Sequence, residues 1–153
     1  MQAAPLLAGE QGRTLIVCGD TPLLKTTTLQ KLIEQHDQEN NKLTVLSAIV
    51  PNPRGYGRII RGSDGSVSEI VEQADVNEKQ IAINEVNAGV YVFDNKLLFE
   101  YLDKLSPTNA QGEYYLTDLI KMFKNAGLKI GASIAGDYQE MLGINDRRQL
   151  EEA

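Results

Sequence analysis

The sequence predicts an α/β or α+β domain built on a mixed, mostly parallel sheet with a β-hairpin insert. Two short apolar runs, residues 13–18 and 43–50, each stop at a proline-containing turn, which is typical of buried parallel strands. A stretch of helical period separates them, as in a parallel crossover. Further on, an Asp-Gly turn at residues 64–65 joins two short apolar runs and predicts a hairpin.

The first half of the chain supplies two apolar strands, one helix and the hairpin. The run 13–18 is expected to be a buried strand because it is apolar and ends at Gly-Asp-Thr-Pro. Residues 24–38 carry apolar side chains at helical spacing, and any of the threonines at 26–28 could cap this helix. In order, the elements are strand 13–18, helix 24–38, strand 43–50 and hairpin strands 59–61 and 67–72.

The second half follows a polar stretch, residues 73–80, which is expected to hold at most one helical turn. A long run of β-branched and aromatic residues predicts the next strand. Two amphipathic stretches predict helices, the second of which stops at Gly127. In order, the elements are strand 84–94, helix 96–105, helix 116–126, strand 128–134, a helical turn at 138–142 and a helix at 146–152.

Composition limits the classes of partner. A chain of 153 residues is the length of one domain and suffices for a core. Its net charge is −6 and the sequence has no block of like charges, so nothing indicates nucleic acid or an anionic membrane as a partner. A polyphosphate ligand would need a cation to screen its charge. The single cysteine, Cys18, excludes an internal disulfide framework and favours a cytoplasmic location. Neither a membrane span nor a signal peptide is expected, because every apolar run is too short.

The predicted strand 84–94 carries polar groups that a buried strand should not tolerate unpaired. Because side chains alternate between faces, Glu85, Asn87 and Gly89 point one way and small apolar residues the other. A strand face that carries an amide side chain at Asn87 and then no side chain at Gly89 is typical of the floor of a polar pocket. The alternative is an edge strand with one solvated face.

Two oxygen-bearing side chains are candidate ligands for a hard cation such as Mg²⁺. Ligands of open α/β sheets bind beyond the carboxyl ends of parallel strands, which points to Gly19 and Asp20. Asp20 could instead stabilise the bend at the following Thr-Pro. Asn145 could ligate with it or act as a helix N-cap.

Weaker signals come from a glycine turn, a strand-end acid and the start of a helix. The turn around Gly57 would let a ligand approach the backbone, although turns take glycine anyway. Glu72 either faces the same cleft as Asn87 or lies in water. Tyr115 and Thr117 either line a site or, for the threonine, cap a helix.

The sequence carries no signature of other chemistries. His36 lies near a helix end, where a protonated imidazole would suit the dipole, and no chemical role is expected for it. Cys18 and His36 make a poor nucleophile–base pair. There is no P-loop, zinc-ligand spacing or GxGxxG.

Six segments match one family in order and spacing: residues 19–23, 55–59, 70–73, 83–89, 109–118 and 143–146. The asparagine–glycine strand and the stretch Asn-Ala-Gln-Gly-Glu-Tyr-Tyr are specific, whereas Gly-Asp and Gly-Tyr-Gly are common among sugar-phosphate nucleotidyltransferases. Over almost its whole length the chain resembles the uridyltransferase domain of the bacterial bifunctional N-acetylglucosamine-1-phosphate uridyltransferases, whose second activity is glucosamine-1-phosphate acetyltransferase.

The resemblance implies a Rossmann-like nucleotidyltransferase fold. It also implies the reaction of UTP with N-acetylglucosamine 1-phosphate to give UDP-N-acetylglucosamine, a cell-wall precursor, and pyrophosphate. The implied cofactor is Mg²⁺, held by Asp20 and Asn145, and the parent protein would be a cytoplasmic homotrimer. The other implied substrate contacts are Gly57, Glu72 and Asn87 for the N-acetylglucosamine unit, Tyr115 and Thr117 for the lining of its pocket, and Gly19 for the uridine nucleotide.

The chain departs from that family at its start. The glycine-rich loop Gly-x-Gly-Thr-x-Met and the phosphate-binding lysine after it are not in the sequence, and Cys18 stands where relatives often have an aromatic residue. We therefore expect residues 1–153 to be a partial domain, the C-terminal two-thirds of a uridyltransferase domain, without the β-helix acetyltransferase domain. Each lost charge contact typically costs about 10²- to 10³-fold in rate, so this chain alone should be nearly inactive.

Two alternative functions remain open. The chain could be a noncatalytic module that binds a sugar nucleotide, or a nucleotidyltransferase for glucose 1-phosphate. With the family's leading strands missing, the edge of the strand at residues 14–18 is expected to be uncovered and to cause self-association.

Overall fold

The computed structural model describes residues 3–143, so the predicted Asn145 and the predicted helix at 146–152 lie outside the described residues. The helices and 3-10 turns are α1 (Ala4–Leu7), α2 (Thr26–Gln38), η1 (Gln73–Asp75), α3 (Asn95–Leu102), α4 (Asp118–Asn125) and η2 (Tyr138–Met141). The strands are β1 (Arg13–Ile16), β2 (Leu43–Ile49), β3 (Arg58–Arg61), β4 (Val67–Val71), β5 (Glu85–Asp94) and β6 (Ile130–Ile134).

Local chemistry explains where the helices begin and end. The side chain of Asp94 accepts the Leu97 amide at 3.2 Å and so caps α3. α4 ends as predicted at Gly127, whose φ of 70° suits a glycine. α2 differs from the prediction, because its N-cap is Lys25 and no local side chain caps its amides.

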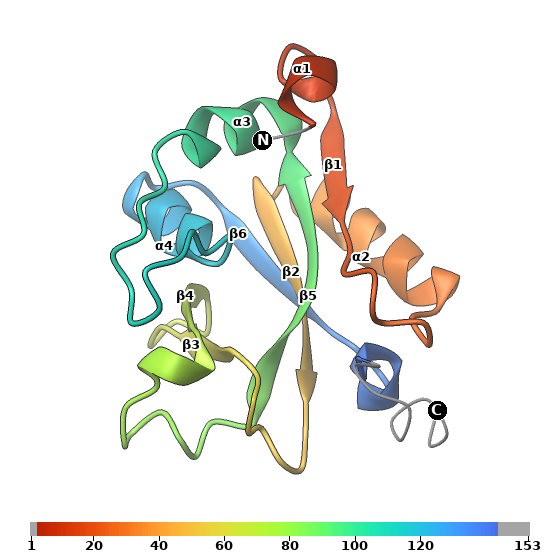
Figure 1. The fold of residues 1–153 in the computed structure, drawn as a ribbon. Helices are drawn as coiled ribbons and strands as arrows, with labels where there is room; N and C mark the ends of the chain where they lie inside the picture. The colour runs from red at the N-terminus through yellow and green to blue at the C-terminus, as the bar shows by residue number, and fades with distance from the viewer. Residues whose placement is uncertain (1–2, 144–153) are drawn as a thin grey trace.

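The strands form one mixed sheet in the order β4-β3-β5-β2-β6, with β1 attached to β5 (Figure 1). The α/β class and the β3–β4 hairpin are confirmed. The prediction of a mostly parallel sheet is wrong for the described residues, because only β2 and β6 pair in parallel. β5 runs antiparallel to all three of its partners.

The wrong strand direction has a physical cause. Helices cover both faces of β2, so its sequence is apolar on both sides whichever way its neighbours run. β1 was expected to be buried, yet its residues alternate between exposed and half-buried. Among the described residues it has a strand neighbour on one edge only. Of its two apolar residues, Ile16 packs against the first apolar cluster and Leu15 is exposed.

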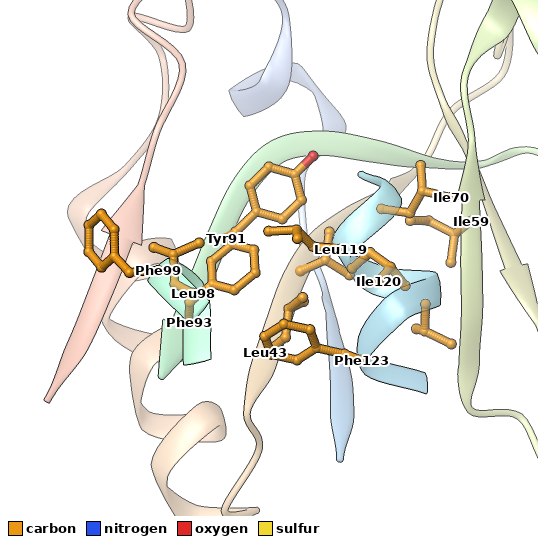
Figure 2. Packing of buried hydrophobic residues seen from close by; sticks show 12 residues of the cluster. Leu43, Ile59, Ile70, Tyr91, Phe93, Leu98, Phe99, Leu119, Ile120 and Phe123 are labelled. Carbon is orange, nitrogen blue, oxygen red and sulfur yellow. The ribbon is translucent and has the colours of Figure 1, made fainter. Parts of the chain in front are cut away.

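Two apolar clusters hold the layers together. The first packs α3 and α4 on one face of the sheet, and the second packs α2 and η2 on the other (Figure 1). Tyr91, Phe93 and Phe123 form the aromatic centre of the first cluster, with ring centroids 5.9 Å apart in each successive pair (Figure 2). The sheet is therefore the middle of three layers.

Two features near α1 and α2 differ from the sequence expectations. α1 was not predicted; Asn95 holds the segment by donating to the carbonyls of Leu7 and Glu10. His36 was expected to suit a protonated state, but its ring is buried and bonds Thr44 Oγ1 at 3.0 Å. Burial lowers the pKa of His36, which favours the neutral imidazole.

Candidate functional site

Along one edge of the central strand β5, two different strands pair with its two ends. Along the other edge, a single strand, β2, pairs with both ends. On the first edge, β3 pairs at Val86, whereas β1 pairs only from Tyr91 onward. Residues 87–90 lie between these two strands, and no described strand pairs with them on this edge (Figure 1). We refer to residues 87–90 as the strand gap.

A hollow of about 410 Å³ lies at the strand gap. Its walls come from the loop after β1, the turn before β3, the end of β4, the strand gap and the chain around η2. The lining residues are Cys18, Asp20, Thr21, Arg54, Gly55, Tyr56, Gly57, Glu72, Asn87, Ala88, Gly89, Met141 and Gly143.

The hollow brings together four predicted site residues: Asp20, Gly57, Glu72 and Asn87. Gly19 precedes Asp20 but is not one of the lining residues. Tyr115 and Thr117 line an adjoining hollow of about 220 Å³, which also touches Glu72. The placement of Asn145 is not described.

Asn87 is fixed in the floor of the hollow by three hydrogen bonds. Its amide nitrogen donates to the Tyr91 hydroxyl at 2.6 Å, and its amide oxygen accepts the Gly89 N–H at 3.0 Å. Its backbone N–H donates to the carbonyl of Gly57 at 2.9 Å. Asn87 thus lines a hollow at the place where the sequence leads us to expect either a polar pocket floor or a solvated edge.

Tyr91 links this floor to the apolar core. Its ring packs in the first cluster (Figure 2). Its hydroxyl accepts the hydrogen bond from Asn87. Burial raises the pKa of Tyr91 well above its usual range, although the hydrogen bond from Asn87 opposes the shift. The hydroxyl therefore stays protonated at neutral pH and remains a neutral partner for the amide.

Glu72 is held beside the glycine turn. Its Oε1 accepts the hydroxyl of Thr117 at 2.8 Å, so this threonine supports the carboxylate and makes no side-chain cap for α4. A Cβ on Gly57 would lie 3.1 Å from Glu72 Oε2 and from Ile70 Cγ2. A side chain at this position would therefore require Glu72 or Ile70 to shift by a few tenths of an ångström.

Cys18 and Gly89 make a second close approach. The thiol donates to the Gly89 carbonyl at 3.4 Å, and a Cβ on Gly89 would lie only 2.6 Å from its sulfur. Gly89 also has a φ of 71°, which L side chains rarely adopt. Burial and the nearby charge of Asp20 raise the pKa of Cys18, so the thiol is a poor nucleophile here.

The charged groups of the lining are two carboxylates, Asp20 and Glu72, against one guanidinium, Arg54. An anionic ligand therefore needs a cation with it. In residues 3–143, no group of three or more His, Cys, Asp or Glu side chains could hold a metal ion. Asp20 can still supply one hard oxygen ligand to a divalent cation whose other ligands are phosphate oxygens and water.

Some of the lining residues that the sequence did not predict come from the far end of the chain. Met141 and Gly143 close one wall of the hollow, and Arg54 contributes its positive charge. A larger hollow of about 630 Å³ lies at the opposite end of β5, near His36 and Asp94. None of the predicted site residues lines it, so size alone does not identify the candidate site.

The chain is similar in sequence to known proteins. Residues 1–138 match the family described as Nucleotidyl transferase. The chain is 53% identical over 151 residues to the bifunctional protein GlmU of Lactococcus lactis subsp. lactis and 47% identical over 152 residues to that of Bacillus subtilis. These alignments cover 99% of this chain and 33% of each relative. The chain thus spans a third of the length of these curated relatives.

A solved structure shares the fold. It is a Bacillus anthracis protein, assigned as a glucose-1-phosphate thymidylyltransferase, in complex with a sucrose. It superposes with a TM-score of 0.70 at 20% identity, over 97% of this chain and 55% of that one. Within the described part of our chain, every helix is too short or too polar to cross a bilayer.

Proposed function

The chain belongs to the nucleotidyl transferase family, and from this premise we propose that its hollow binds UDP-N-acetylglucosamine. The reaction proposed for the whole protein forms this sugar nucleotide and pyrophosphate from UTP and N-acetylglucosamine 1-phosphate. The proposal draws on the resemblance to the uridyltransferase domain and on relatives that are about half identical along this chain.

The observation that carries the proposal is the fixed amide at the hollow's floor. Tyr91 and Gly89 hold the Asn87 amide in one orientation, and Thr117 holds the carboxylate of Glu72. Both polar groups therefore need no reorganisation to bind a sugar. A site built to hydrogen-bond a substrate discriminates against an analogue that leaves its groups unpaired, and this favours an acetamido sugar over glucose.

We assign the divalent cation to Asp20, with Asn145 as its second ligand. Mg²⁺ held there would neutralise the charge of the phosphates. Asp20 is suited to this role because it lies in the loop after β1 and lines the same hollow as Asn87 and Glu72. Its carboxylate would orient the diphosphate next to the sugar subsite.

The chain's own residues would act mainly by positioning. A phosphate oxygen of the sugar phosphate attacks the α-phosphorus of UTP in line, and such transfers need alignment and charge neutralisation more than a protein base. Asn87 and Glu72 would hold the sugar, so that its phosphate points toward Asp20. The 153-residue chain has no glycine-rich loop for the triphosphate, and we expect it to bind the sugar nucleotide with little turnover.

We further propose that residues 1–153 form part of a uridyltransferase domain, that the protein works in the cytoplasm, and that the isolated chain self-associates. A reaction that consumes UTP and a single free cysteine both favour the cytoplasm. Self-association is favoured by the uncovered edge of β1 within the described residues.

Titration calorimetry with excess Mg²⁺ tests the sugar-nucleotide site. We expect the wild-type chain to bind UDP-N-acetylglucosamine more tightly than UDP-glucose. Asn87→Ala should weaken the binding of UDP-N-acetylglucosamine by roughly tenfold, since a hydrogen bond to a fixed partner contributes about 1.4 kcal/mol or less. The loss for UDP-glucose should be smaller.

Asn125→Ala is the matched control, because this exposed asparagine ends α4 and does not line the hollow. Its affinities should equal those of the wild type. Equal losses for both sugars in Asn87→Ala would remove the argument for the acetamido group. A wild-type chain that binds neither nucleotide would refute the proposed function.

A further inference from the structure

The start of helix α2 is bonded to a side chain from far along the chain. Its N-cap residue, Lys25, offers no side-chain acceptor to the first turn. The carboxylate of Glu140, in η2, bonds to this residue and to the hydroxyl of Thr28 instead. Its Oε2 accepts the Lys25 N–H at 3.3 Å and the Thr28 hydroxyl at 2.5 Å, and its Oε1 accepts from Lys25 Nζ at 3.1 Å.

Glu140 is suited to a permanent contact of this kind. The residue is 5% exposed, and a buried carboxylate persists only when it is well paired. Burial raises its pKa, but the hydrogen bonds from Thr28 and Lys25 outweigh burial and lower it, so the group stays ionised at neutral pH. A negative charge at this place also complements the dipole at the start of α2.

The two segments that Glu140 joins both end in the candidate site. On one side, Asp20 and Thr21 lie in the loop that leads into α2, and the Thr21 carbonyl accepts the Leu24 N–H at 3.4 Å. On the other side, Met141 and Gly143 follow Glu140 in the chain and form the facing wall. The Glu140 contacts therefore fix one wall of the hollow relative to the other.

We propose that Glu140 is a positioning residue of the sugar-nucleotide site, although it does not line the hollow itself. It holds the loop of Asp20 against the chain around Met141, and so sets the width of the hollow where the diphosphate and its cation would bind. This inference rests on the proposed function. Removal of a residue that orients a metal ligand typically costs about 10- to 100-fold in metal affinity or activity, and Asp20 is the proposed cation ligand.

The test compares Glu140→Ala and Glu140→Gln with the wild-type chain. UDP-N-acetylglucosamine affinity is measured by calorimetry in excess Mg²⁺, and hydrogen exchange is measured without ligand. We expect about 10- to 100-fold weaker binding in Glu140→Ala and faster exchange confined to residues 20–28 and 138–143. Glu140→Gln keeps an acceptor for Thr28, so it should recover part of the affinity.

Asp94→Ala is the matched control, because it removes another carboxylate at the start of a helix, here α3. Asp94 borders the larger hollow and not the candidate site. Both alanine variants should lower the melting temperature by a similar few degrees. Only Glu140→Ala should lose ligand affinity, which a purely structural role would not predict.

The outcomes separate the two claims. If the wild type binds and Glu140→Ala binds equally well, the positioning role is refuted while the proposed function stands. If both alanine variants lose affinity equally, the effect is one of general stability and the positioning role is again refuted. If Glu140→Ala does not fold, Thr28→Val removes one contact of the same carboxylate and should weaken binding severalfold; unchanged binding would refute the role. A wild-type chain that does not bind refutes the proposed function and this inference together.

Discussion

The single residue with the most constrained surroundings in the candidate site is Gly89. Its φ of 71° is nearly that of Gly127, which has a φ of 70° at the end of α4. A Cβ would meet nothing within 4 Å at Gly127, but would approach the sulfur of Cys18 to 2.6 Å at Gly89. The two glycines therefore separate the cost of backbone conformation from the cost of a close contact.

We predict that Gly127→Ala lowers the free energy of unfolding by about 1–2 kcal/mol, the cost of a left-handed conformation. Gly89→Ala should lower the free energy of unfolding by this amount and by roughly 1–3 kcal/mol more, because the added Cβ collides with the sulfur of Cys18. The double variant Gly89→Ala/Cys18→Ala should return to the Gly127→Ala value. Urea denaturation measures all three, and equal losses in the two single variants would show that Cys18 moves away freely.

The hydroxyl of Tyr91 gives a second prediction. Tyr91→Phe removes the acceptor of the Asn87 amide and leaves the aromatic core in place. A neutral hydrogen bond contributes about 1 kcal/mol, so UDP-N-acetylglucosamine should bind roughly fivefold more weakly in calorimetry. Tyr101→Phe makes the same change on α3, away from the hollow, and should bind as the wild type does. Unchanged binding in Tyr91→Phe would mean that Asn87 keeps its orientation without this partner.

Among the elements, α2 is joined to the sheet by a buried polar contact as well as by apolar packing. His36 and Thr44 connect the end of α2 to β2, and His36 is the only histidine of the chain. Asp37 and Asp94 raise its pKa and Arg13 and Lys42 lower it, but burial is the largest effect and the net pKa is below 6.5. The folded protein therefore holds this imidazole neutral where the unfolded chain would take a proton.

Stability should accordingly depend on pH in one window. Above about pH 7 both states are neutral at His36, and this group causes no change. As the pH falls through 6.5, the unfolded state binds a proton that the folded state does not, so the free energy of unfolding decreases until the lower, folded pKa is passed. Urea denaturation between pH 8 and pH 5.5 measures this. His36→Asn should flatten the profile in that range, and an unchanged slope would exclude His36 as its origin.

The elements also show how far the sequence could be interpreted. The period of apolar residues predicted α2, α3, α4 and the strands to within a few residues, because one covered face suffices to set that period. Strand direction could not be predicted, since a strand that is covered on both faces is apolar on both sides whether its neighbours run parallel or antiparallel to it. α1 is four residues long and is held by Asn95, a contact that no local pattern indicates.

The site was predictable where its residues lie in recognisable segments. Asp20, Gly57, Glu72 and Asn87 were predicted and do share one hollow, although what they bind remains a proposal. Glu140 was missed because its contacts lie 112 to 115 residues away in the sequence. A buried acid in a polar segment is indistinguishable from a solvated one until the chain is folded.

At the scale of the whole molecule, one edge of the sheet is the least protected surface. β1 pairs with β5 alone among the described residues, and Leu15 beside its free edge is 36% exposed. Unpaired backbone groups next to apolar side chains favour pairing with another chain.

We therefore predict that the isolated chain forms concentration-dependent oligomers in sedimentation velocity. Leu15→Lys should shift the distribution toward monomer, because a charged side chain beside a free edge opposes strand pairing. Ile81→Lys, at an exposed position after η1, should leave the distribution unchanged. A monomer at every concentration tested would contradict the prediction.

The remote contact at the start of α2 has a consequence for how the chain is made. During translation, Thr28 leaves the ribosome 112 residues before the acid that bonds to it. At about 5–20 residues per second, that delay is on the order of 10 s. Through this interval the Lys25 N–H and the Thr28 hydroxyl lack the carboxylate that accepts them in the folded protein. The loop that carries Asp20 consequently reaches its final place only when synthesis of these 153 residues is nearly finished.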